Sequence, residues 1–84
     1  MRKILRLPDV KTQSGYSRST LYLLISQGLW PKPVKLGARS VGWPSDEVEV
    51  LNSARISGRS DAEIRDLVSQ LHRARKSIEN GIIG

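Results

Sequence analysis

The chain has 84 residues, no cysteine and a formal net charge of +6 at pH 7. That length allows one small domain, in which folding buries only about 60% of the surface of the unfolded chain. The lack of cysteine excludes disulfide bonds and thiolate metal sites. The longest apolar run, residues 23–25, is far shorter than the roughly 20 residues of a membrane-spanning helix, and the start of the chain lacks the apolar region of a signal peptide. We therefore expect a cytoplasmic protein without a membrane partner.

The positive charge is concentrated in the first half of the chain. Residues 1–44 contain one acid, Asp9, whereas residues 45–84 contain seven acids and six basic residues. The basic residues of the first half are Arg2, Lys3, Arg6, Lys11, Arg18, Lys32, Lys35 and Arg39. A basic excess alone is weak evidence for a nucleic-acid partner, but here it coincides with a helix pair, which strengthens that interpretation.

Two short helices joined by a tight turn are predicted after a start, residues 1–7, that is either a basic arm or a short strand. The first helix covers about residues 8–14, because proline is favoured in a first turn and Gly15 permits a left-handed stop. Ser17 is expected to cap a second helix that continues to about Gln27. We expect this pair to pack as one unit.

The second predicted helix has an apolar edge and a polar edge. Leu21, Leu24 and Ile25 follow the i, i+3, i+4 spacing of a buried stripe. The polar residues of the same helix are Arg18, Ser19, Thr20, Tyr22 and Ser26. A packed helix pair whose second member offers polar side chains is typical of a helix-turn-helix that binds nucleic acid.

A small β-hairpin is predicted next. Pro31 and Pro33 exclude a helix around them, because two close prolines remove backbone donors and favour extended neighbours. Residues 34–36 and 41–43 are then expected to form two strands around a turn at residues 37–40. The hairpin is either a DNA-binding wing with basic side chains or an ordinary solvated hairpin.

The register of this hairpin is predicted from its apolar residues. If Leu36 pairs with Val41, then Val34 pairs with Trp43, and all four side chains share one face. In that register Lys35 lies on the opposite face. The remaining wing candidates, Arg39 at the tip and Lys32 before the first strand, need only reach a phosphate group.

A third helix is predicted after Pro44. Ser45 is expected to be its N-cap, with acidic residues in the first turn. Val48, Leu51 and Ile56 are expected to face the core, and the helix is expected to end near Gly58.

A fourth, amphipathic helix is predicted from Ser60, because Ser60 and Glu63 match a capping box. Its apolar stripe consists of Ile64, Leu67, Val68, Leu71 and Ile78. The helix is expected to end near Ser77, and residues 80–84 are expected to fray. This helix either packs on the rest of the chain, pairs with a second copy in a homodimer, or holds a partner such as an integrase or RNA polymerase; packing within the chain is the default. We divide the chain into a DNA-binding domain, 1–57, and this helix with its tail, 58–84.

Several candidate residues have both a functional and a structural interpretation. Arg18 stands where a groove-reading side chain would emerge, and the alternatives are a phosphate contact or a solvated side chain. Tyr22 either contacts DNA or covers the apolar edge of its helix. Trp30 and Trp43 are expected in the core, and His72, which lacks partners at metal-ligand spacing, is expected on the surface.

Motifs for catalysis and for cofactors are missing from the sequence. It has no Walker loop, dinucleotide fingerprint or nucleophile elbow, and no general acid/base pair is recognisable. We therefore expect neither enzymatic activity nor a cofactor.

With these residues considered, the chain resembles the AlpA family of phage and prophage regulators, within the wider excisionase and MerR-like group. The resemblance covers about residues 4–57 and is carried by residues 6–10, 15–22, 28–37, 39–43 and 47–48. It implies a mostly α winged helix-turn-helix with a small β-hairpin, whose second helix enters the major groove of double-stranded DNA. Members act as transcriptional activators of prophage genes or as excisionases that bend attachment-site DNA for an integrase. Similar members often carry basic residues at the positions of Leu23 and Gly42.

The favoured function is therefore a sequence-specific DNA-binding regulator, with excisionase as the alternative. A protein-interaction module that acts through the last helix is a second hypothesis from another class. RNA binding is less favoured, because the chain has few aromatic residues and none on the presumed exposed face of the sheet.

Overall fold

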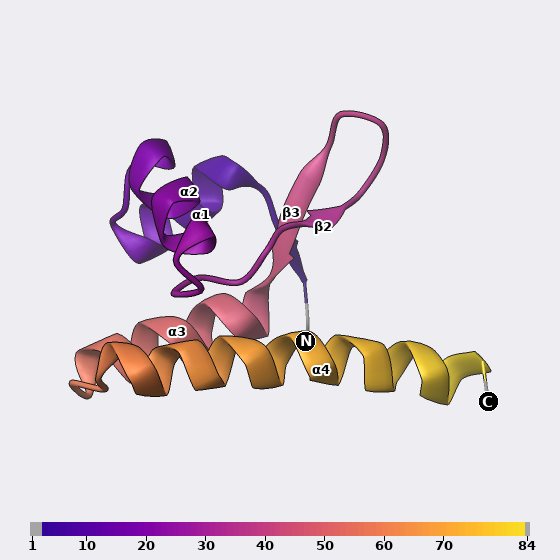
Figure 1. The fold of residues 1–84 in the computed structure, drawn as a ribbon. Helices are drawn as coiled ribbons and strands as arrows, with labels where there is room; N and C mark the ends of the chain where they lie inside the picture. The colour runs from indigo at the N-terminus through magenta and orange to yellow at the C-terminus, as the bar shows by residue number, and fades with distance from the viewer. Residues whose placement is uncertain (1–2, 84) are drawn as a thin grey trace.

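The computed structural model describes residues 3–83, with side chains for residues 3–76. This part of the chain is mostly helical with a small antiparallel sheet, in agreement with the coarse fold expected from the sequence. In chain order the elements are β1 (Ile4–Leu5), α1 (Leu7–Ser14), α2 (Arg18–Ser26), β2 (Val34–Lys35), β3 (Val41–Pro44), α3 (Ser45–Ile56) and α4 (Asp61–Ile83). Figure 1 shows α4 along one side of the molecule with α3 packed beside it, and α1, α2 and the sheet on top of this helical layer.

The helix pair α1–α2 forms as its capping residues predict. Gly15 ends α1 in the left-handed conformation, with φ 77°, which is accessible to glycine without strain. The Ser17 side chain then accepts a hydrogen bond from the backbone N–H of Thr20 at 3.2 Å and caps α2. Leu21 is fully buried, so the predicted apolar edge of α2 faces the core.

Within the predicted arm or strand, Ile4–Leu5 form a strand, and the described sheet has three strands in the order β1-β3-β2. β3 therefore lies in the centre and pairs with Leu5 on one side and with β2 on the other. The predicted hairpin register is wrong by one residue: Val34 pairs with Gly42, and Lys35 pairs with Val41.

Two contacts explain the observed register. The indole N–H of Trp43 donates a hydrogen bond to the carbonyl of Pro31 at 2.8 Å, which anchors Trp43 in the core. Gly42 lies on β3 beside its antiparallel neighbour β1, and a Cβ atom there would be 2.5 Å from Cγ2 of Ile4. Because a shift of one residue moves a side chain to the other face, Lys35 shares the face of Trp43, contrary to the prediction.

Helix α3 begins differently from the prediction. Its N-cap is Pro44, and Ser45 makes no cap. The Ser45 hydroxyl instead accepts a hydrogen bond from the backbone N–H of Lys3 at 2.9 Å, and the Ser45 N–H donates to the Lys3 carbonyl at 2.7 Å. These two bonds extend the β1–β3 pairing by one residue.

The buried face of α3 contains Val48 and Leu51 as predicted, whereas Ile56 is 87% exposed and its predicted core position is wrong. With 3.6 residues per turn, Ile56 lies about 140° around the helix from Leu51, while Ala54 lies about 60° from it. Ala54 is accordingly the buried residue of the last turn.

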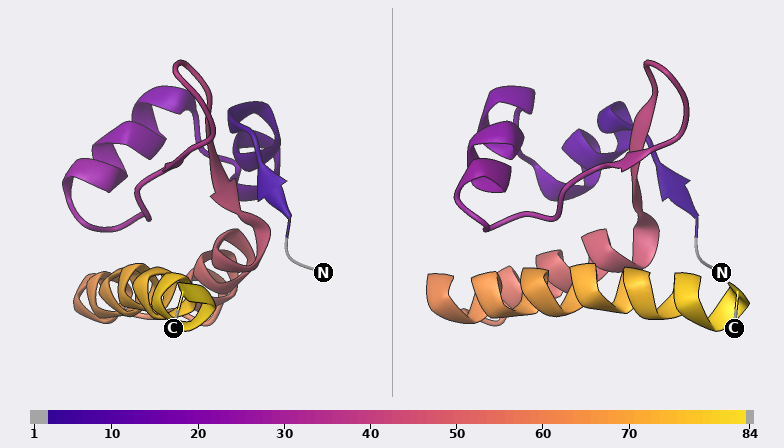
Figure 2. Two further views of the ribbon diagram at one scale, coloured as in Figure 1. Left: turned by 90° about the vertical axis from the view of Figure 1, so that its right-hand side faces the viewer. Right: turned by 45° about the vertical axis from the view of Figure 1, so that its right-hand side comes forward.

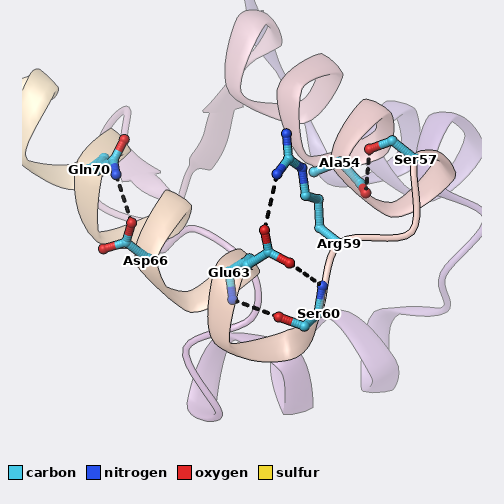
Figure 3. Close-up of polar contacts among 7 residues, drawn as sticks. All are labelled: Ala54, Ser57, Arg59, Ser60, Glu63, Asp66 and Gln70. Carbon is cyan, nitrogen blue, oxygen red and sulfur yellow. Dashed lines mark hydrogen bonds and ion pairs between the residues drawn. The ribbon is translucent and has the colours of Figure 1, made fainter.

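The predicted capping box starts α4. The Glu63 N–H donates to the Ser60 hydroxyl at 3.2 Å, and the Ser60 N–H donates to the Glu63 carboxylate at 3.1 Å, as Figure 3 shows. The bond from the Ser60 N–H to the carboxylate, the Arg59 ion pair and the Ser60 hydroxyl lower the pKa of Glu63, because each favours the charged carboxylate. The helix continues to Ile83, past the predicted end near residue 77 and through most of the tail expected to fray.

One hydrophobic core connects these elements. Its members from the last helix, Ile64 and Val68, are buried against residues of α1, α2, β3 and α3. The described part of α4 thus packs within the chain, as the default interpretation expected; the side chain of Ile78 lies outside the described residues. The division into 1–57 and 58–84 stays a prediction.

Within residues 3–83, no helix has the combined length and apolarity that crossing a membrane would need.

Candidate nucleic-acid interface

The polar edge of α2 is open to solvent. Arg18, Ser19 and Tyr22 are exposed and together line one shallow hollow on the surface. The guanidinium of Arg18 lies 5.6 Å from the centre of the Tyr22 ring, in the geometry of a cation–π contact. This contact holds the arginine along the helix with its charge at the surface.

The other two hydroxyl residues of α2 are engaged by their own helix. Thr20 is half-buried, and its Oγ1 accepts a hydrogen bond from the Ser17 hydroxyl at 3.0 Å. The Ser26 hydroxyl donates to the carbonyl of Leu23 at 2.6 Å. The Ser19 hydroxyl makes no hydrogen bond to any described residue and is therefore available to a ligand.

The hairpin of β2 and β3 presents two of the predicted cations. Lys35 and Arg39 are both exposed, and the Leu36 N–H donates to the Ser40 carbonyl at 2.8 Å to close the turn that contains Arg39. Arg6 braces this hairpin, because its Nε donates to the Val41 carbonyl at 3.1 Å. Sequence reasoning counted Arg6 only as a charge. The signal in the sequence is that Arg6 directly follows Leu5, the last residue of β1.

Figures 1 and 2 show α2 and the tip of the hairpin on the side of the molecule away from α4. Lys32 lies apart from them, in the linker between α2 and β2 and beside α4. Its backbone N–H donates to Nε2 of His72 at 3.1 Å, and its carbonyl accepts from Arg75 at 2.9 Å. The Lys32 side chain is exposed, and its contact with DNA stays a prediction.

His72, which was expected on the surface, is only partly accessible there, because its Nε2 is bonded to the linker. It is half-buried, and its burial lowers its pKa, with the nearby Arg75 cation acting in the same direction. The signal in the sequence is its spacing of four residues from Val68, which places it on the buried side of α4. The prediction for the tryptophans is confirmed, since Trp30 is 2% exposed and Trp43 is fully buried.

Comparison with known proteins shows the family of the chain, which the geometry alone does not give. A family model described as "Prophage CP4-57 regulatory protein (AlpA)" matches residues 3–56. The chain belongs to the AlpA family. The match contains the helix pair and the sheet and ends at the last residue of α3, so α4 lies outside the part that defines an AlpA protein.

A relative from Enterobacteria phage P4, the uncharacterized protein ORF88, is 44% identical to this AlpA protein over 57 residues. The aligned region covers 68% of the chain and 65% of the relative. No solved structure matches. The membership of the AlpA family inferred from the sequence is therefore confirmed, and the chain is a member of a regulatory family of phages and prophages.

Proposed function

We propose that this protein is a sequence-specific DNA-binding regulator of phage or prophage genes, in which α1 and α2 act as a helix-turn-helix and the β2–β3 hairpin acts as a wing. The observation that carries this proposal is the exposed edge of α2, with Arg18 held over Tyr22. Helix α2 itself lies, with the tip of the basic hairpin, on the side of the molecule away from α4 (Figure 2). Membership of the AlpA family supports it.

The proposed mechanism needs no bond chemistry. Lys35, Arg39 and the exposed cations around them bind phosphates and fix the position of the domain on the duplex. α2 lies in the major groove, where Arg18 donates two hydrogen bonds to one guanine, and Ser19 and Tyr22 contact the adjacent base or phosphate. Thr20 and Ser26 contribute through the acceptor capacity of their oxygens. Recruitment of RNA polymerase or of an integrase, and a homodimer formed through α4, stay predictions.

The proposed phosphate contacts make the DNA affinity depend on salt concentration. If about four to six phosphates are neutralised, the logarithm of the affinity falls with the logarithm of salt concentration with a slope of roughly −4 to −5. Each good bidentate contact to a base adds about 1–3 kcal/mol of discrimination against other bases.

The test starts from a duplex that the full-length protein selects from a random library. Arg18→Ala should weaken binding to that duplex by about 1–3 kcal/mol and relax the preference at one base pair. Arg73→Ala is the matched control, because Arg73 is an exposed arginine on α4 and its loss should leave the preference unchanged. Equal enrichment of all sequences, or an unchanged preference in Arg18→Ala, would contradict the proposal.

A further inference from the structure

The linker between α2 and the hairpin is held by α4, a helix outside the family match. Lys32 lies near the end of this linker, two residues before β2, and both of its backbone polar groups are bonded to α4. His72 accepts its N–H at 3.1 Å, and Arg75 donates to its carbonyl at 2.9 Å. Lys32 stands between two prolines, which restrict the backbone on either side of this attachment.

A second attachment joins α4 to the end of α2. Nε of Arg65 donates to the carbonyl of Gln27 at 2.9 Å, and Gln27 is the C-cap residue of α2. Carbonyl groups at a helix C-terminus lack partners within the helix, so an arginine there also interacts favourably with the helix dipole. Arg65 thus fixes the position where α2 ends and the linker begins.

Helix α4 is also attached to α3 by a buried ion pair. Arg75 donates from Nε to Glu47 of α3 at 2.9 Å and forms a second bond to the other carboxylate oxygen. Glu47 is only 1% exposed, so this two-bond pair is shielded from water. The linker is also held by β3, because the indole N–H of Trp43 donates to the Pro31 carbonyl at 2.8 Å.

We propose that α4 is a brace for the DNA-binding surface, and that Arg65, His72 and Arg75 are positioning residues that set the distance and angle between α2 and the hairpin. This inference rests on the proposed function. DNA binding needs α2 and the hairpin to engage the duplex at the same time, and a linker already held in its bound conformation does not have to be ordered during binding. The part of the chain that defines the family therefore gains its geometry from a helix that follows it.

The experiment uses the full chain with His72→Leu and Arg65→Met combined. This double variant removes the contacts to Lys32 N–H and to Gln27 but keeps the buried pair of Arg75 and Glu47, so the fold is retained. Arg73→Met is the control for loss of an exposed charge on α4. His72→Gln is the conservative variant, since the Gln side-chain oxygen can accept the Lys32 N–H in place of Nε2.

The first measurement needs no DNA. Amide hydrogen exchange at Lys32 should become faster in the double variant and stay slow in His72→Gln and Arg73→Met. Residual dipolar couplings of the α2 and hairpin amides should report a changed or averaged relative orientation in the double variant. Unchanged exchange and unchanged orientation would overturn the inference, whatever the DNA results.

The second measurement uses the duplex selected by the wild-type protein. The double variant should bind it on the order of ten-fold more weakly, with His72→Gln and Arg73→Met close to wild type. Arg39→Ala should weaken the double variant less than it weakens the wild type, because the misplaced hairpin contributes less; partial unfolding alone would not change this ratio. Wild-type affinity of the folded double variant would overturn the brace, whereas failure of the wild-type protein to select any duplex would overturn the proposed function instead.

Discussion

Gly42→Ala tests the register of the sheet that supports the hairpin. The added Cβ would lie 2.5 Å from Cγ2 of Ile4, 2.9 Å from the carbonyl oxygen of Leu5 and 3.2 Å from Cδ1 of Leu36. Favourable carbon contacts lie at about 3.5–4.0 Å, so all three neighbours must move. The Ile4 and Leu36 side chains are each 44% exposed and can rotate away.

The contact with the carbonyl oxygen of Leu5 decides how much stability Gly42→Ala loses. It belongs to the backbone of β1, and Leu5 is paired with Trp43, so it can move only if β1 and β3 separate. Overpacking of this kind destabilises by about 1–3 kcal/mol. In a domain of this size that corresponds to a decrease in Tm of about 4–8 °C for each kcal/mol.

Urea unfolding followed by circular dichroism measures the effect, with Gly37→Ala as the matched control. Gly37 lies in the same hairpin, has no heavy atom within 4 Å of the added Cβ and has no positive φ, so its substitution should be neutral or stabilise by about 0.4–1 kcal/mol. Combining Gly42→Ala with Ile4→Ala should recover only part of the loss, because the contact with Leu5 remains. Equal stability of Gly42→Ala and Gly37→Ala would refute the observed register.

Two further predictions concern the contacts around the linker. Because burial lowers the pKa of His72 in the folded protein below its ordinary value of 6.5, the unfolded chain binds the proton more readily. The contribution of neutral His72 to the free energy of unfolding should be complete above a pH of about 6.5 and decrease as the pH falls through the folded pKa. Urea unfolding of wild type and of His72→Gln at roughly pH 7.5 and 5 isolates this effect. The same pH dependence in both proteins would contradict it. Trp43→Phe should destabilise by about 1–3 kcal/mol beyond its volume change, because the buried Pro31 carbonyl loses its donor. Trp30→Phe is the control, since the buried Trp30 indole N–H has no hydrogen-bond partner in the part of the chain that the structure describes. An equal loss in both variants, measured by urea unfolding, would count against the Trp43 bond.

The features that sequence predicted correctly are those set by neighbours along the chain. Gly15, Ser17 and the pair of Ser60 and Glu63 mark helix ends through hydrogen bonds within four residues, so their residue types are sufficient. The polar edge of α2 was predictable for the same reason, because the spacing of Leu21, Leu24 and Ile25 fixes which side is buried.

The features that sequence missed depend on contacts between distant segments. Ser45 has the residue type of an N-cap, but Lys3 arrives from the start of the chain and uses its hydroxyl. Gly42 leaves room on β3 for the neighbouring strand β1, and a two-strand pattern gives no information about a third strand. The roles of His72 and Arg75 likewise require knowledge of where the linker passes α4.

The central claim, that DNA lies against α2 and the hairpin, is tested most directly by nuclear magnetic resonance. The selected duplex is titrated into 15N-labelled full-length protein, and the amide shifts are followed at two salt concentrations. The account predicts salt-sensitive shifts in residues 18–26 and 35–40, with the groove between α3 and α4 that Ser53, Leu67 and Gln70 line left unchanged. Shifts that centre on that groove, with α2 unaffected, would contradict it.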